Sequence, residues 1–127
     1  MELDNYFLSK HDYLGRYIEI CDNITPILGY SKIELIGTLS YDLFNPNFIR
    51  DISKSHFNKN LTKVSYQIRS KDGHFVYVTT LSFKSLDNGI PNDYMYCLTR
   101  KMTLFEIINL ELNRILFKML KKFKIDK

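Results

Sequence analysis

Residues 63–84 read KVSYQIRSKDGHFVYVTTLSFK, a pattern that predicts two antiparallel strands joined by a tight turn. Apolar residues occupy every second position from 64 to 68, which is the period of a strand with one buried face. Lys71-Asp72-Gly73 has the composition of a tight turn. Residues 75–84 are rich in β-branched and aromatic side chains, so we expect a long strand there.

Further elements are predicted on both sides of this hairpin. Residues 6–21 predict an N-terminal hairpin, and residues 24–60 predict a series of short helices. Residues 87–93 have the composition of a turn-rich loop, and residues 94–99 predict a closing strand. From Thr103 onward the apolar residues recur with a helical period. The predicted order is two strands, short helices, three strands and a long helix.

Composition bounds the class of protein. The chain has 127 residues, 45% hydrophobic and 25% charged, which suits one folded domain. It contains no apolar run long enough to span a membrane and no N-terminal signal pattern, so we expect an intracellular protein, cytoplasmic or nuclear, that does not bind membranes. Cys21 and Cys97 are too few for a disulfide framework or a four-ligand zinc site.

The net charge of +4 is concentrated at one end of the chain. Residues 100–127 hold eight Lys and Arg against three acidic residues, a balance of +5, whereas residues 1–99 hold ten against eleven, a balance of −1. The body is therefore nearly neutral. Since no DNA-reading module accompanies the basic end, we do not expect direct binding of nucleic acid.

Five short motifs follow one another along the chain: Leu28-Gly29-Tyr30-Ser31, Glu34-Leu35-Ile36-Gly37, Tyr41-Asp42-Leu43, Asn45-Pro46 and Lys71-Asp72-Gly73. In this order and spacing, they resemble a PAS domain over residues 8–100. The resemblance implies an α+β fold, with a five-stranded antiparallel sheet, short helices on one face and a long C-terminal helix. We expect the PAS domain to occupy residues 1–102 and a basic amphipathic helix to occupy residues 103–127.

A narrower resemblance is to the second PAS domain of basic helix-loop-helix PAS transcription factors. It rests on Ser55-His56, on Tyr66 and on the run at residues 75–80. The chain departs from that subgroup at residues 45–48, where Asn-Pro-Asn-Phe replaces the frequent His-Pro-Asp-Asp, and at Tyr77, where tryptophan is usual.

The two faces of the long strand at residues 75–84 differ in character. Even positions are small and β-branched, while odd positions are mostly large and apolar. The resemblance turns the even positions toward a cavity beneath the short helices. A shift of one residue would exchange the two faces, and this is the alternative. The expected cavity residues are His56, Tyr66, Ile68, Val78, Thr80, Ser82, Cys97 and Thr99.

Large apolar side chains on the outer face of the sheet need a cover, which the terminal helix or a second protein could supply. PAS domains as a family pair through this face, so we expect another PAS domain as partner, in a homo- or heterodimer. The helix offers a second apolar seam, although packing of this seam on its own domain is an equal alternative. The expected interface residues are Phe75, Tyr77, Leu81, Phe83, Tyr96, Leu98, Ile108, Leu112, Ile115 and Met119.

Catalytic and metal-binding patterns are absent from the sequence. The glycines do not form a phosphate-binding loop, and His11, His56 and His74 lie in different predicted elements. His56 is either a core histidine, a polar group in a ligand pocket or an axial haem ligand. We expect no enzyme activity and no cofactor, because the Asn-Cys-Arg-Phe-Leu-Gln run of flavin-binding PAS domains is missing and a core role for His56 is preferred to haem binding.

The sequence therefore predicts an intracellular PAS module for signalling and protein interaction, in transcription regulation. The alternative is a sensor that binds a small molecule in its cavity.

Overall fold

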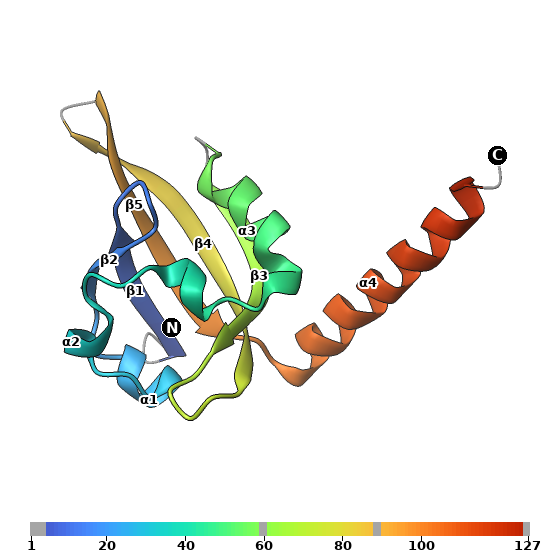
Figure 1. Ribbon diagram of the computed structural model, residues 1–127, viewed down its shortest axis with the longest axis horizontal. Coiled ribbons are helices and arrows are strands. Elements are labelled where there is room, and N and C mark those ends of the chain that lie inside the picture. Colours follow the sequence, from blue (N-terminus) through green and yellow to red (C-terminus); the bar gives the residue numbers. More distant parts are fainter. Residues whose placement is uncertain (1–4, 59–60, 88–89, 126–127) are drawn as a thin grey trace.

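The computed structural model describes residues 5–58, 61–87 and 90–125. A five-stranded antiparallel sheet with the order β2-β1-β5-β4-β3 forms its centre (Figure 1), which confirms the predicted sheet. The strands are β1 (Tyr6–His11), β2 (Tyr17–Ile20), β3 (Thr62–Arg69), β4 (Phe75–Asp87) and β5 (Ile90–Lys101).

Short helices cover one face of this sheet, and a long helix leaves the body (Figure 1). The covering elements are α1 (Ile24–Leu28), α2 (Lys32–Leu35), the 3₁₀ turns η2 (Ser40–Leu43) and η3 (Pro46–Phe48), and α3 (Ile49–His56); the long helix is α4 (Leu104–Ile125).

The predicted register of β4 agrees with the structure. Val78, Thr80 and Ser82 are 0%, 3% and 5% exposed and face the short helices, whereas Phe75, Leu81 and Phe83 on the opposite face are 40%, 37% and 41% exposed. The hydrophobic core thus lies between the inner face of the sheet and the short helices. Its main members are Phe7, Tyr17, Ile24, Leu28, Phe48, Ile52, Tyr66, Ile68 and Val78.

The turn between β3 and β4 is attached to the short helices at several points. The backbone N–H of Lys71 donates to the carbonyl of Leu28 at 2.9 Å, and the Tyr30 hydroxyl donates to the carbonyl of Arg69 at 2.8 Å. Lys71 also forms an ion pair with Glu34. These bonds join α1 and α2 to the far end of the sheet, although the two regions are about 40 residues apart in the chain.

The start of α4 is fixed on the body by a capping box and an ion pair. The backbone N–H of Thr103 donates to Glu106 at 2.9 Å, and that of Glu106 donates to the Thr103 hydroxyl at 3.2 Å. Arg100 binds the same carboxylate through two bonds of 2.8 Å and 2.6 Å, and this guanidinium lowers the pKa of Glu106 to about 2.

Three element boundaries differ from the prediction. The loop expected at residues 87–93 is mostly strand, since Leu86 pairs with Pro91 and Asp87 with Ile90; its centre, residues 88–89, lies outside the described residues. The helix expected to reach residue 60 ends at His56, and residues 59–60 also lie outside the described part.

Gly29 allows a test of the contact between α1 and the turn. Its φ is 89°, and a Cβ there would lie 3.2 Å from Cβ of Lys71; Gly73 has φ of 101° but open space around it. Gly73→Ala should lower the free energy of unfolding by about 1 kcal/mol through backbone strain. Gly29→Ala should cost more, because the turn must also move. Urea unfolding measures both, and equal losses would contradict this close contact.

Candidate functional site

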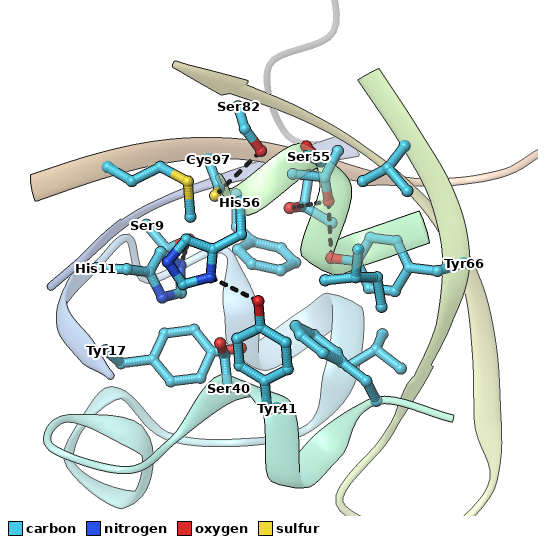
Figure 2. Close-up of a pocket in the computed structure, with 18 residues that line it drawn as sticks. Ser9, His11, Tyr17, Ser40, Tyr41, Ser55, His56, Tyr66, Ser82 and Cys97 are labelled. Atoms are coloured by element: carbon cyan, nitrogen blue, oxygen red, sulfur yellow. Dashed lines mark hydrogen bonds between the residues drawn. The ribbon is translucent and has the colours of Figure 1, made fainter. Parts of the chain in front are cut away.

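A small cavity lies between the inner face of the sheet and the segment that contains η2 and α3 (Figure 2). Its volume is about 40 Å³. Seven of the eight predicted cavity residues line it: His56, Tyr66, Ile68, Thr80, Ser82, Cys97 and Thr99.

Val78 corrects the predicted lining. Its side chain has no exposed surface and belongs to the hydrophobic core, but it does not reach the cavity wall. The alternation along the strand accounts for the inward direction of the Val78 side chain. It does not report at which point along the strand the short helices leave a cavity. The prediction missed several other lining residues: Phe7, Ser9, His11, Tyr17, Ser40, Tyr41, Phe44, Ile52, Ser55, Val64 and Met95.

His56 is held between two partners at the rim of this cavity. Figure 2 shows its ring next to Tyr41, whose hydroxyl lies 2.5 Å from Nδ1. Nε2 lies 3.0 Å from the carbonyl of Tyr13, which can only accept, so Nε2 carries the proton and Nδ1 accepts from Tyr41. Burial, followed by the charge of Lys84, lowers the pKa of His56. The ring is therefore a neutral, fully bonded histidine.

A second polar group crosses the sheet on the cavity side. The hydroxyls of Tyr66 and Thr80 are 2.8 Å apart, and those of Thr80 and Thr99 are also 2.8 Å apart. Beside them the Ser82 hydroxyl lies 3.5 Å from Sγ of Cys97. Burial raises the pKa of Tyr66, and raises that of Cys97 to about 11, so Cys97 is a protonated and unreactive thiol at neutral pH.

His11 is the largest omission from the predicted lining. Its Nδ1 lies 3.3 Å from the carbonyl of Gly15, and its Nε2 lies 2.8 Å from the Ser9 hydroxyl. The carbonyl fixes the proton on Nδ1, so Nε2 accepts from Ser9. Burial lowers the pKa of His11 to about 4. Phe7, Ser9 and His11 alternate along β1 and are all buried, but Ser9 and His11 are polar, so no apolar alternation in the sequence marks this face.

The cavity is small and its polar lining is bonded. One water molecule needs roughly 10–15 Å³ of cavity volume. The cavity of about 40 Å³ therefore suits about three waters or a molecule of a few heavy atoms. No fully buried side-chain nitrogen or oxygen in the described part of the chain lacks a partner. Among residues 5–58, 61–87 and 90–125, no group of three or more His, Cys, Asp or Glu is placed to hold a metal ion.

The outer face of the sheet carries aligned rows of apolar side chains. Leu8 pairs with Leu98 and Leu98 with Leu81, so three leucines form a row across β1, β5 and β4. In the next row, the rings of Phe83 and Tyr96 stack with centroids 5.6 Å apart. We call this set the outer patch; it consists of Leu8, Leu81, Phe83, Tyr94, Tyr96 and Leu98.

Predicted interface residues outside the outer patch have different surroundings. Tyr77 lies on the same face, but it is partly buried and its hydroxyl donates to Glu111 of α4 at 3.0 Å. Phe75 is exposed at the beginning of β4, away from the outer patch. The predicted helix seam does not pack on the body: Ile108, Leu112, Ile115 and Met119 are each about half exposed.

No helix in the described part of the chain is both long and apolar enough to span a bilayer.

The histidine environments predict a loss of stability in acid. Between pH 6.5 and 4, the His11 ring is protonated in the unfolded chain but neutral in the folded chain. The free energy of unfolding therefore falls as the pH falls through this window. From pH 7.5 to pH 5, His11 alone should account for about 2 kcal/mol. In His11→Gln, the free energy of unfolding measured with urea should fall less between these two pH values than it does in the wild type.

The matched control is His74→Gln, since this side chain lies at the surface and the variant keeps the buried His11 ring, so the loss due to His11 should remain. If His11→Gln loses as much stability in acid as the wild type, the buried neutral ring is not the cause.

Comparisons with known proteins agree with the fold. The profile of the family described as PAS domain matches residues 4–98. The chain is 25% identical over 91 residues to the aryl hydrocarbon receptor nuclear translocator homolog of Drosophila melanogaster, covering 64% of this chain and 13% of that protein. It is 29% identical over 75 residues to human basic helix-loop-helix ARNT-like protein 2, covering 55% of this chain and 12% of that protein.

Among solved structures, the Drosophila melanogaster Cycle PAS-B domain with bound ethylene glycol has a TM-score of 0.65 and 22% identity, covering 76% of this chain and 99% of that one. This likeness shows the fold. The chain thus spans about an eighth of the length of the curated relatives, 13% and 12%, and corresponds to a single domain within them. With a profile match over residues 4–98 and the same five-stranded sheet, the chain belongs to the PAS domain family.

Proposed function

We propose that this PAS domain is a protein-interaction module whose outer patch binds a PAS domain of a partner protein. The outer patch carries the proposal, because its large apolar residues are between one third and one half exposed at Leu8, Leu81, Phe83 and Tyr94. Burial of a fully exposed apolar side chain is worth about 1.5–3 kcal/mol; these residues have part of that gain left, and a cover over several of them adds these parts together. An apolar centre with a charged rim is typical of protein interfaces.

The surroundings of the outer patch favour a protein over other partners. Lys10 lies at its edge, with Nζ 4.4 Å from the Tyr94 ring centroid, and Arg100 lies at its other side in an ion pair with Glu106. Thus the apolar rows are bordered by charges that are already paired or placed on aromatic rings. The polar contacts of α4 with the sheet are made at Tyr77 and Arg100, which are not members of the outer patch.

The related transcription factors suggest the setting of this interaction. The matched human relative is named as a basic helix-loop-helix protein, and most of the present chain is a PAS domain. We extend this to the present chain as a role in regulating transcription through pairing with another PAS protein, at an intracellular site, cytoplasmic or nuclear. The role needs no catalytic step and no cofactor.

Leu81→Glu tests the outer patch. The wild-type chain, used as bait in extract of the cells that express it, should enrich a protein with a PAS domain, and Leu81→Glu should weaken that capture at least about tenfold. Leu81 is 37% exposed, so a charge there is tolerated by the fold. Mass spectrometry of the captured proteins provides the measurement.

Ile33→Glu is the matched control, because Ile33 is 90% exposed on α2 and lies away from the sheet. It should capture the same partner as the wild type. Enrichment of the same PAS proteins by Leu81→Glu, or of none by the wild type, would refute the outer patch as the interface.

A second candidate function is the sensing of a small molecule in the cavity. What favours it is the mixed lining, in which hydroxyls of Tyr66 and Thr80 and the ring of His56 border apolar walls. The related Cycle PAS-B domain has been solved with ethylene glycol, a molecule of the size that about 40 Å³ admits. A ligand could shift an equilibrium of the domain only by binding one state more tightly than the other.

Titration with ethylene glycol tests this second function. In amide NMR spectra, saturable shifts should appear at residues such as Tyr66, Thr80 and Cys97, which line the cavity. Ser82→Leu fills the space at a cost of about 1–3 kcal/mol in stability and should abolish the saturation. Shifts that stay linear and scatter over the surface in the wild type would rule out a cavity ligand of this kind.

A further inference from the structure

The contacts of α4 with the rest of the chain lie on one side of the helix. Glu106 binds Arg100, Glu111 accepts from Tyr77, and Leu110 packs against the rim of the core. The Arg114 guanidinium lies 4.0 Å from the centroid of the Phe48 ring. At 100° per residue, positions 106, 110, 111 and 114 fall within an arc of about 140°, so they define a single face turned toward the body.

The opposite side of α4 is apolar and exposed. With 100° between successive residues, nine apolar side chains fall in an arc of about 160° that points away from the Leu110 and Arg114 face. An amphipathic helix ordinarily turns such an apolar arc toward its own core. Since α4 turns it to the solvent, a contact with another molecule would bury it. The nine residues, each 49–74% exposed, are Leu104, Phe105, Ile108, Leu112, Ile115, Leu116, Met119, Leu120 and Phe123. We call this set the outward stripe.

The centre of the outward stripe has the same spacing in both directions. A seam runs through the outward stripe at positions 105, 108, 112, 115 and 119 and continues to Lys122, which is outside the stripe. The steps between these positions are 3, 4, 3, 4 and 3. A second α4 running in the opposite direction therefore meets it in full register, with Ile108 opposite Met119 and Leu112 opposite Ile115. At the ends of the seam, Lys122 would lie opposite Phe105, whose ring can accept a lysine stem and ammonium.

The charges along α4 favour this antiparallel direction. Glu106 and Glu111 lie near its beginning, while Lys118, Lys121 and Lys122 lie near its end. A parallel pair would place Lys122 opposite Lys122 and bring the other lysines together, and like charges at contact distance repel. In an antiparallel pair with this register, Lys122 of one helix lies opposite Phe105 of the other, so the two Lys122 side chains are about 25 Å apart along the axis and the basic ends do not meet.

We propose that the outward stripe binds the outward stripe of a second copy of this chain, as an antiparallel pair of α4 helices related by a two-fold axis between Leu112 and Ile115. Such a pair is a self-complementary interface of the kind found in symmetric dimers. It leaves the outer patch of each sheet free. It is thus independent of the partner proposed above, and the two proposals fail separately.

Sedimentation of the full chain at micromolar concentration tests the pairing. The wild type should be a dimer, and Leu112→Glu should weaken association at least about 100-fold, because the symmetric interface loses the contact twice. Leu81→Glu should remain a dimer. Circular dichroism checks that α4 still forms in Leu112→Glu, and Ile115→Gln is a milder second variant. A monomeric wild type, or a dimer unaffected by both α4 variants, overturns the proposal.

Disulfide trapping determines the direction of the helices. In a Cys21→Ser background, which removes the exposed native thiol, Ile108→Cys and Met119→Cys chains are mixed and oxidised. An antiparallel pair gives the mixed disulfide and little of either homodisulfide. Predominant Ile108→Cys homodisulfide indicates a parallel pair and overturns the proposed arrangement.

Discussion

A chain of buried hydroxyls ties strands β3, β4 and β5 together at one register. Tyr66 on β3 bonds to Thr80 on β4, and Thr80 bonds to Thr99 on β5, each at 2.8 Å. A shift of β4 by one residue would turn Thr80 to the other face and leave the hydroxyls of Tyr66 and Thr99 without this partner. Each unsatisfied buried group costs about 1–3 kcal/mol. The fold depends on this register, since it decides which side chains meet the helices.

Both candidate sites follow from the same register. On the inner face it gathers polar groups that bond to each other around a cavity of about 40 Å³. On the outer face it aligns Leu8, Leu98 and Leu81 in a row. The buried polar side chains around the cavity are hydrogen-bonded within the described part of the chain, whereas the outer patch and the outward stripe have apolar surface that it leaves uncovered. Because of this contrast, we propose that the domain binds other proteins through the outer patch and the outward stripe.

Local patterns in the sequence were sufficient for the sheet. The alternation at residues 75–84 separates two faces of the strand, but only the resemblance to PAS domains turned Thr80 and Ser82 inward and Leu81 and Phe83 outward, and the structure agrees with that direction. His11 and Ser9 were missed because β1 is short and its place beside β5 is a long-range pairing that no local pattern reports. Val78 was misplaced for a related reason, since the position of the cavity depends on how the helices pack.

The direction of α4 also could not be derived from its own sequence. Helical periodicity shows an apolar stripe, and packing of that stripe on the sheet was a natural alternative. The orientation is set instead by Arg100 with Glu106, by Tyr77 with Glu111 and by Arg114 over Phe48. Those contacts join residues distant in sequence, and together they turn the stripe outward.

Methyl NOE spectroscopy on leucine- and isoleucine-labelled protein tests the register most directly. The structure predicts contacts from the Leu81 methyls to those of Leu98, its pairing partner on the outer face, and none to Ile24 or Ile52 in the core. Contacts from Leu81 to either isoleucine would mean that the two faces of β4 are exchanged. In that case neither the cavity nor the outer patch would exist as described.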